Sequence, residues 1–371
     1  MQIPSQAQNV IMTERTSVER IAISSIDSID SELLNWKTPV VLTGIVTEWQ
    51  AFTLWRANYL CERVGHRLVK VGVSRSRVFQ YGTGSAAQTE AREMLFKDAI
   101  HRIANHSEDS DERLYIMEQN GQKQNSFAEI YPELAADFTA PPGVDINKLM
   151  QTNLWIGSKG NVTPLHFDIA NNFLCQIEGR KRITCFDPSQ TDRLYPTGYG
   201  DKIDNTSQVQ ILEPDFTKHP RYRDAVPTHC ILDPGEVIYI PPFWWHQVES
   251  LDIATSLNFW WAPRITQCLH PMGIELMRFF HKRDHLSEVA GAVVPEFADF
   301  AKFATYCLGR GYKCIALFFA KAELETRCNK DPVSVHKAIE PWRGLLNIAE
   351  NGDDSQLDDR QVAAVLESLG S

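Results

Sequence analysis

The stretch NVTPLHFD at residues 161–168 places His166 two positions before Asp168, and a second histidine, His246, follows the run GEVIYIPPFWW at residues 235–245. Side chains two residues apart lie on the same face of a β-strand, so His166 and Asp168 can converge on one ion. Two imidazoles and one carboxylate on one side of an octahedron are typical ligands of non-haem iron oxygenases, because they leave the other positions free. The ligand set therefore predicts an iron-dependent oxygenase.

An isolated His-x-Asp pair also arises by chance, so the prediction needs further support. The residues that flank the motifs provide it. Val237–Ile240 are β-favouring residues that follow the turn signal Pro234-Gly235, and Pro241-Pro242 then ends the strand. We expect the bend at the two prolines to direct His246 back into a barrel.

A second feature is Lys181, which lies in an expected hairpin. Asn172–Ile177 and Arg180–Phe186 are strand-like and are joined by a turn at Gly179, which would make them antiparallel neighbours. If Lys181 points inward, its buried ammonium needs an anionic partner. A dicarboxylate such as 2-oxoglutarate, which chelates iron at one end and pairs with Lys181 at the other, has the required shape. The alternative is that Lys181 is a solvated strand residue between two arginines.

Four stretches match a known family: GNVTP at 160–164, QIEGRKR at 176–182, RLYP at 193–196 and YIPPFWWHQVES at 239–250. On these motifs, residues 152–263 resemble the Jumonji-C branch of the 2-oxoglutarate oxygenases. Within that branch they are most similar to the asparaginyl hydroxylase that inhibits hypoxia-inducible factor and to the cupin-like bacterial proteins around it.

The resemblance implies a mainly β core, a double-stranded β-helix of the cupin or jelly-roll type, with flanking helices and a helical C-terminal region. It implies an oxidoreductase that uses iron(II), 2-oxoglutarate and O2, a dioxygenase that hydroxylates a side chain in a protein or peptide. It also implies that the iron ligands and catalytic residues are His166, Asp168 and His246. The residues that it assigns to the co-substrate are Lys181, Thr163, Tyr115, Asn172 and Asn258.

One departure from the family concerns the substrate. The asparaginyl hydroxylase has an Arg-Gln pair before Ser-Gln-Val that grips the target side chain, whereas this chain has Asn205-Thr206 before Ser207-Gln208-Val209. The metal and co-substrate machinery carries over by resemblance, but an asparagine target does not.

Patterning along the chain predicts four parts. We expect a disordered N-terminus over 1–15, an α/β part over 16–149 that packs on the barrel, the catalytic core over 150–264 and a C-terminal helical region over 265–371. Within the second part, Thr89–Asn105 is expected to be a helix. In the last part, Phe297, Phe300, Ala304 and Cys307 recur at helical spacing, as do Ile339, Trp342, Leu346 and Ala349. The family resemblance implies a homodimer through these helices.

Composition restricts the class of protein. A net charge of −10 argues against general binding of nucleic acid, which depends on neutralising phosphates. The N-terminus has no basic segment followed by an apolar run, and no stretch approaches about 20 apolar residues, the length of a membrane span. Eight cysteines without paired spacing suit free thiols. We therefore expect a cytoplasmic protein.

Other functions stay open at this stage. N-methyl-lysine demethylation follows the same chemistry, with loss of the hydroxylated methyl group as formaldehyde. A cupin metal enzyme that does not use 2-oxoglutarate, for example a zinc or manganese isomerase, and a non-catalytic binding module are alternatives from other classes, since fold alone does not determine function.

Overall fold

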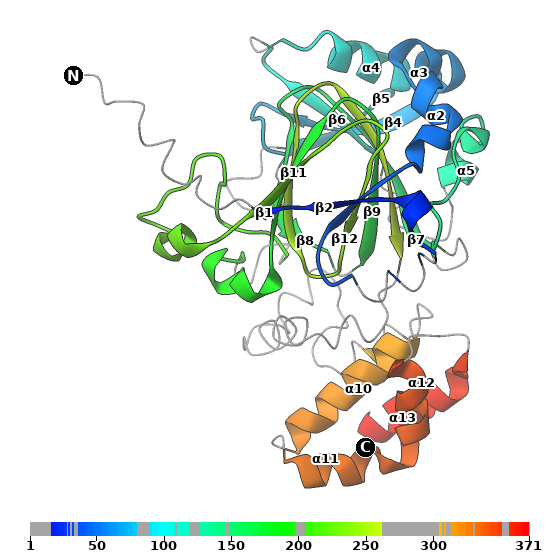
Figure 1. Ribbon diagram of the computed structural model, residues 1–371, viewed down its shortest axis with the longest axis vertical. Coiled ribbons are helices and arrows are strands. Elements are labelled where there is room, and N and C mark those ends of the chain that lie inside the picture. Colours follow the sequence, from blue (N-terminus) through cyan, green and yellow to red (C-terminus); the bar gives the residue numbers. More distant parts are fainter. Residues whose placement is uncertain are drawn as a thin grey trace.

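Two β-sheets wrap into a barrel (Figure 1). The structure is a computed structural model that describes residues 16–261 and 304–370, apart from 28, 30–31, 33–35, 80–88, 108–109, 119–126, 145–148, 169, 198–204, 306–307, 309–312, 329–330 and 351–355. The smaller sheet has the strand order β1 (Thr16–Ser17), β11 (Thr228–Leu232), β10 (Lys181–Phe186), β13 (Trp245–Ser250) and β8 (Val162–Phe167). The larger sheet has the order β2 (Glu19–Ala22), β3 (Val40–Thr43), β12 (Val237–Ile240), β9 (Asn171–Glu178), β14 (Ala254–Trp261), β7 (Leu149–Gly157), β6 (Arg113–Glu118), β4 (Leu68–Ser74) and β5 (Thr89–Leu95).

Along the core the chain passes back and forth between the two sheets, except that β11 follows β10 in the smaller one. β8, β10 and β13 belong to the smaller sheet, whereas β9, β12 and β14 belong to the larger one. This alternation is the double-stranded β-helix, so the predicted fold class is confirmed. It also means that the predicted hairpin of β9 with β10 is wrong. β9 pairs with β12 and β14, while β10 pairs with β11 and β13.

Gly179 lies where the chain crosses from β9 to β10. Its φ is +68°, and a Cβ added there would lie 2.0 Å from the carbonyl oxygen of Ile253. Only glycine accepts both the left-handed backbone and this close approach. The turn signal at Gly179 was therefore interpreted correctly as a reversal, but the reversal leads into the opposite sheet rather than into a paired strand.

The N-terminal part extends the larger sheet instead of forming a separate layer of strands. β4 pairs with β5 and β6, and β6 pairs with β7 of the core. The predicted helix over Thr89–Asn105 is wrong in its first half, because Thr89–Leu95 is strand β5 and only Phe96–Ala104 is helical, as α4. The residues of β5 favour helices, but pairing with β4 along the whole strand overrides this weak local preference.

Helices cover the outer side of the larger sheet (Figure 1). They are α2 (Gln50–Leu54), α3 (Ala57–Val64), α4 and α5 (Phe127–Ile130). The main hydrophobic core includes Trp55, Phe96 and Leu154, all fully buried. Each such side chain contributes roughly 1.5–3 kcal/mol by leaving water. A second core, with Leu174, Ile183 and Ile240, lies between the two sheets.

The C-terminal region is helical where it is described. Its helices are α10 (Lys313–Arg327), α11 (Pro332–Ile339), α12 (Arg343–Glu350) and α13 (Asp359–Gly370). They share a core of their own that includes Ala304, Trp342, Leu346 and Ala349, as their spacing predicts. Phe297, Phe300 and Cys307 lie outside the described residues, as does the predicted N-terminus over 1–15. The four-part division of the chain stays a prediction.

Short 3-10 helices connect several of these elements, and they span Ile23–Ser25, Val46–Glu48, Ala135–Asp137, Pro188–Arg193, Pro220–Asp224 and Glu340–Trp342. Among the described residues, every helix is too short or too polar to cross a lipid bilayer.

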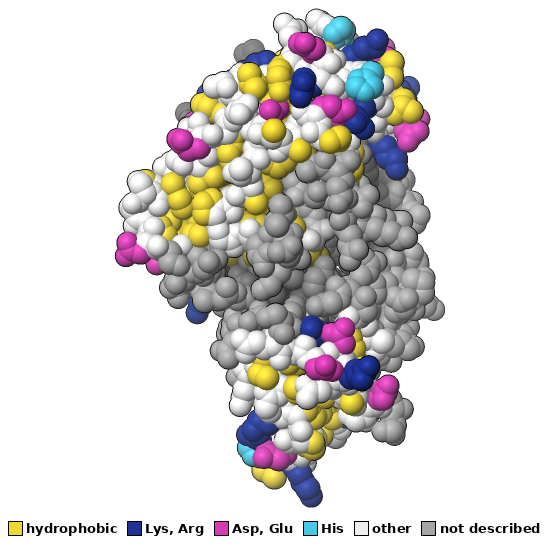
Figure 2. Space-filling view, turned by 90° about the vertical axis from the view of Figure 1, so that its right-hand side faces the viewer, with side chains coloured by type: hydrophobic (Ala, Val, Ile, Leu, Met, Phe, Trp, Pro, Cys, Tyr) yellow, Lys and Arg dark blue, Asp and Glu magenta, His cyan; other side chains and the backbone are white. Residues whose placement is uncertain are grey.

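Basic and acidic side chains lie next to one another at both ends of the face in Figure 2. The cysteines with described environments, Cys61, Cys175, Cys185, Cys230 and Cys328, are free thiols, as predicted.

Candidate metal and co-substrate site

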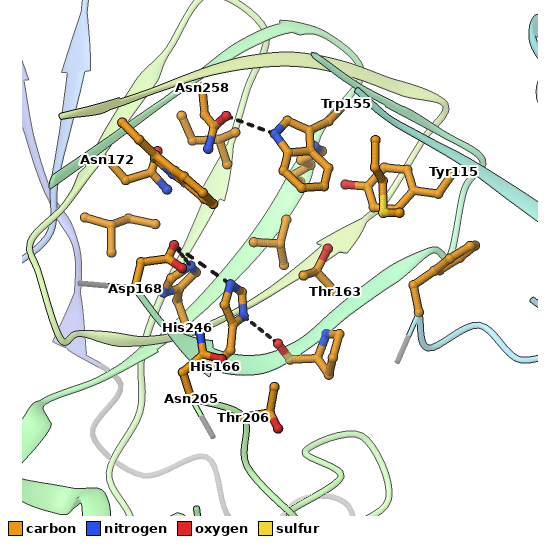
Figure 3. Close-up of a pocket in the computed structure, with 18 residues that line it drawn as sticks. Tyr115, Trp155, Thr163, His166, Asp168, Asn172, Asn205, Thr206, His246 and Asn258 are labelled. Atoms are coloured by element: carbon orange, nitrogen blue, oxygen red, sulfur yellow. Dashed lines mark hydrogen bonds and ion pairs between the residues drawn. The ribbon is translucent and has the colours of Figure 1, made fainter. Parts of the chain in front are cut away.

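A cavity of about 350 Å³ opens between the two sheets of the barrel. All eight side chains predicted for the site line it: Tyr115, Thr163, His166, Asp168, Asn172, Lys181, His246 and Asn258. They come from six strands, with Asp168 directly after β8, and Figure 3 shows nearly all of them converging on one space. The barrel therefore brings together residues that lie up to 143 positions apart, from Tyr115 to Asn258.

The three predicted metal ligands meet at the end of β8. His166 and His246 are direct cross-strand partners of β8 and β13, and Asp168 follows β8 immediately. One ligand atom from each residue lies within 4.8 Å of the other two. Asp168 Oδ2 is 3.6 Å from His246 Nε2 and 4.0 Å from His166 Nε2. These atoms face a common point (Figure 3).

Each histidine is oriented by a backbone carbonyl two residues earlier. His166 Nδ1 donates to the carbonyl of Pro164 at 2.8 Å, and His246 Nδ1 donates to the carbonyl of Trp244 at 2.9 Å. A carbonyl oxygen only accepts, so the proton of each neutral ring lies on Nδ1 and Nε2 keeps a free lone pair. Such partners fix the ring orientation and the tautomer that a metal ion requires.

The backbone of Asp168 is also held. Phe243, in the crossing from β12 to β13, donates its N–H to the Asp168 carbonyl at 2.7 Å, and its φ is +67°. A bulky residue in the left-handed region is strained unless its surroundings enforce it. Phe243 is buried, with its ring centroid 6.2 Å from that of Phe167. The two stretches that carry the ligands are thus joined to each other.

The electrostatics at this end favour a cation. Burial raises the pKa of Asp168, and the neighbouring His166 only partly offsets this effect. Burial lowers the pKa of His246 well below its usual value, and the neighbouring His166 lowers it further. Asp168 Oδ2 is buried without a hydrogen-bond partner. A buried carboxylate oxygen facing two imidazole lone pairs is a donor set that fits a divalent ion such as iron(II).

Lys181 lies in the same cavity and carries the opposite charge. It is only 1% exposed, and burial lowers the pKa of its ammonium to about 7, with no described acidic group to raise it. Lys181 therefore points inward as the sequence predicts, and the alternative of a solvated residue is wrong. Its neighbour Arg180 is half exposed and pairs with Asp252 at 2.8 Å. An unpaired buried ammonium is costly, so this end of the cavity favours an anion.

Tyr115 and Thr163 form a pair of hydroxyls in this cavity. Tyr115 is buried on β6, and its hydroxyl is hydrogen-bonded to that of Thr163 on β8. Burial raises the pKa of Tyr115 to about 12, although the Thr163 hydroxyl works against this shift. Tyr115 is thus a neutral hydrogen-bonding group at neutral pH.

Asn172 and Asn258 differ in how much of their hydrogen-bonding capacity is free. Asn258 Oδ1 accepts from Asn153 Nδ2 at 2.8 Å and from Trp155 Nε1 at 3.1 Å, so its oxygen is used by neighbouring side chains. Asn172 Oδ1 is buried without a partner. A ligand would therefore meet the amide N–H of Asn258 and either end of Asn172.

Sequence reasoning missed several parts of the cavity wall, namely Phe79, Met117, Trp155 and Trp260. Phe79 lies in a segment without any motif, so no signal in the sequence marks it. Asn205 and Thr206, which the sequence identifies only as a departure from the family, line the cavity too. The backbone at Thr206 forms an antiparallel bridge with that at His166, which places this pair beside the metal ligands (Figure 3).

Comparisons with known proteins agree with this arrangement. A family model described as a cupin-like domain matches residues 27–267. Lysine-specific demethylase 8 of Xenopus tropicalis is 32% identical over 260 residues, which are 68% of this chain and 54% of that protein. Lysine-specific demethylase JMJ30 of Arabidopsis thaliana is 32% identical over 229 residues, 61% of this chain and 50% of that protein. The tRNA wybutosine-synthesizing protein 5 of Gallus gallus is 28% identical over 244 residues, 62% of this chain and 73% of that protein. The chain thus spans about half the length of the two demethylases.

Proposed function

This chain belongs to the cupin-like domain family, and from that premise we propose that it is an iron(II)- and 2-oxoglutarate-dependent oxygenase that hydroxylates an amino-acid side chain of a protein or peptide. One observation carries the proposal: the partnerless buried oxygen of Asp168, between two imidazoles, shares a cavity with the unpaired buried ammonium of Lys181. The carboxylate of Asp168 favours a bound cation, and the ammonium of Lys181 favours a bound anion. A metal ion chelated by a dicarboxylate supplies both.

In this proposal His166, Asp168 and His246 hold the iron, and Lys181 pairs with the far carboxylate of 2-oxoglutarate. The hydrogen-bonded hydroxyl pair of Thr163 and Tyr115 has one O–H left to donate to that carboxylate, and Asn172 and Asn258 bind the end near the metal. With iron bound, 2-oxoglutarate and O2 become succinate and CO2, and one oxygen atom enters a C–H bond of the substrate.

The protein's own contribution is positioning and exclusion of water. The backbone carbonyls behind both histidines keep Nε2 directed at the ion, so the ligands need little rearrangement when it binds. Apolar wall residues such as Phe79, Leu174 and Val248 surround the polar groups, and in such a dry site charges act more strongly than in water. No general base is needed among these residues.

The substrate is proposed as a side chain that enters past Asn205 and Thr206. These residues stand where the resembling asparaginyl hydroxylase has its Arg-Gln pair, so the kinship to that enzyme and its target stay predictions. The names of two relatives favour a second candidate, demethylation of N-methyl-lysine. In that reaction the hydroxylated methyl group leaves as formaldehyde. The homodimer through the C-terminal helices, the cytoplasmic location and the lack of general nucleic-acid binding likewise stay predictions.

The test is turnover of 2-oxoglutarate by the iron-loaded protein with a peptide library. We expect succinate and CO2 in equal amounts, with a peptide mass gain of one oxygen for hydroxylation or formaldehyde release for demethylation. The Lys181→Met variant should lose this turnover at low 2-oxoglutarate, whereas Arg180→Met, the adjacent exposed cation, should keep it. Metal-dependent activity of the Lys181 variant without 2-oxoglutarate would instead favour a cupin enzyme of another class.

A further inference from the structure

Residues 75–79 run along the free edge of β8, and we call them the edge segment. Val78 forms a parallel bridge with Val162 at the start of β8. The Val162 N–H donates to the Arg77 carbonyl at 2.8 Å, and the Phe79 N–H donates to the Val162 carbonyl at 2.9 Å. The edge segment thus bonds to β8 through Val162. In addition, Arg77 Nε donates to the Gly160 carbonyl at 3.4 Å, and Ser74 Oγ at the end of β4 donates to the Val78 carbonyl at 3.5 Å.

A buried carboxylate connects the edge segment to the outer face of the smaller sheet. Glu249 on β13 is 8% exposed and binds two arginines, one through each oxygen. Arg77 of the edge segment lies 2.5 Å from Oε1, and Arg182 of β10 lies 2.6 Å from Oε2. Charge-assisted bonds of this kind are stronger than neutral ones, although half-exposed arginines lose part of that strength to water.

The edge segment ends on the cavity. Phe79, two residues after Arg77, is 1% exposed and lines the cavity wall. Its ring lies edge-on to that of Tyr115, with 5.3 Å between the centroids. Tyr115 in turn is hydrogen-bonded to Thr163. If Phe79 moves, the Tyr115 ring therefore loses this contact and is less firmly held beside Thr163. Tyr115 and Thr163 lie close together in Figure 3.

We propose that the Arg77–Glu249 ion pair is a latch that positions Phe79 and, through it, Tyr115 for binding of the co-substrate's far carboxylate. This inference rests on the proposed function. Arg77 and Glu249 are positioning residues, because neither lines the cavity. The latch matters because it joins the edge segment to β13, two residues before Phe79, so the ion pair helps to keep Phe79 in the cavity wall.

Arg182 provides a matched control within the same cluster. Arg77 and Arg182 bind the same carboxylate at nearly the same distance, and the side chain of each is 46% exposed. Arg182, however, belongs to β10, which pairs with β11 on one side and β13 on the other. When Arg182 loses its ion pair, the backbone hydrogen bonds to β11 and β13 still hold β10 in place. We therefore expect only the loss of Arg77 to change the packing of the cavity wall.

The test compares Arg77→Met with Arg182→Met in full-length protein loaded with Mn(II), which avoids oxidation. Calorimetric titration with 2-oxoglutarate should give a dissociation constant raised about 3- to 10-fold in R77M and changed less than about twofold in R182M. The Mn(II) affinity, measured by the free-ion resonance signal, should be the same in both. Hydrogen exchange at the Phe79 amide should accelerate in R77M alone, with no ligand added. Arg77→Lys keeps the charge but not the two-nitrogen fork, and should recover part of the binding.

Equal 2-oxoglutarate constants for R77M and R182M, with normal binding by the wild type, would overturn this inference alone. The same holds if both variants weaken binding in proportion to a shared loss of stability. A wild-type protein that binds Mn(II) but no 2-oxoglutarate would overturn the proposed function and this inference together. Should R77M fold poorly, R77K and R182K allow the same comparison at smaller amplitude.

Discussion

The two ends of the cavity are built in different ways. At the metal end, each histidine is oriented by a carbonyl two residues before it, and Asp168 follows His166 by two positions. At the Lys181 end, the ammonium comes from β10, one hydroxyl from β6 and the other from β8. The first end is encoded in short stretches of sequence, whereas the second is assembled from parts of the chain that are far apart.

The ends also carry opposite uncompensated charges. Asp168 Oδ2 has no hydrogen-bond partner among the described residues, and Lys181 has no described acidic neighbour. Both groups are buried, and a lone buried charge is unfavourable. The comparison indicates that one ligand assembly, positive where it meets Asp168 and negative where it meets Lys181, completes the site.

The largest effect is expected at the metal end. His166→Ala takes away one of the three proposed ligands and should lower metal affinity by at least about 100-fold, since even outer partners of metal ligands are worth about 10- to 100-fold. Turnover should vanish. The exposed His101 of α4 is the control, because His101→Ala removes an imidazole far from the cavity. Metal affinity that is equal in both variants would contradict the assignment of His166.

The next effect is expected at the opposite end. Lys181→Met should weaken 2-oxoglutarate binding by roughly 150-fold or more, since breaking a buried ion pair costs about 3–5 kcal/mol. Metal affinity should not change, because Lys181 is not a ligand. Direct titration of both ligands, with Arg180→Met as the control, checks the separation of the two ends. A joint loss of metal and 2-oxoglutarate binding would show that the ends are not independent.

The pH dependence of the Lys181 end is a third test. In the unfolded chain the pKa of Lys181 returns to its ordinary value of 10.5, whereas in the folded ligand-free protein it is about 7. Between these values the unfolded state binds more protons, so the free energy of unfolding rises with pH, by at most about 1.4 kcal/mol per unit. The affinity for 2-oxoglutarate should do the reverse and fall above about pH 7, because a neutral amine cannot pair with a carboxylate.

These two opposite slopes should both disappear in Lys181→Met. Urea denaturation and ligand titration from about pH 7 to about pH 9 measure them, within the range between the folded and unfolded pKa values of Lys181. If the variant keeps the wild-type slopes, then another group titrates and Lys181 is not the charge that binds the co-substrate.

The smallest effect is expected for Tyr115→Phe. The hydroxyl that is lost is one neutral hydrogen-bonding group, worth about 0.5–1.5 kcal/mol, so 2-oxoglutarate affinity should fall about 2- to 10-fold. Metal affinity should stay the same. Tyr222→Phe removes a hydroxyl from another largely buried tyrosine that does not line the cavity, and it should leave both affinities unchanged. Stronger 2-oxoglutarate binding by Tyr115→Phe would contradict the placement of the carboxylate here.

The same contrast explains what the sequence predicts well. The convergence of His166, Asp168 and His246 is predictable because strand alternation and the breaks around it are local properties of NVTPLHFD and PPFWWH. The inward direction of Lys181 is predictable for the same reason, since alternation along β10 determines it. The roles of these residues in binding iron and 2-oxoglutarate stay proposals.

Long-range pairing explains what the sequence does not predict. The turn at Gly179 marks a reversal of the chain but not the sheet that the next strand joins, so the hairpin of β9 and β10 was wrong. Thr89–Leu95 has helix-favouring residues, yet its partner β4 makes it a strand. Phe79 enters the cavity wall from a segment far from the motifs, and nothing near it in sequence indicates a ligand. Trp155 lies only a few residues before GNVTP, but its direction into the cavity depends on the pairing of β7 with β6 and β14.

The most direct measurement is anaerobic titration of metal-free protein with iron(II) and then with 2-oxoglutarate, followed by visible charge-transfer absorption. We expect a band that requires both additions, is absent in His166→Ala, weakens in Lys181→Met and persists in Arg180→Met. No band in a folded wild-type protein that has bound iron would contradict the proposal that one cavity holds the metal and 2-oxoglutarate together.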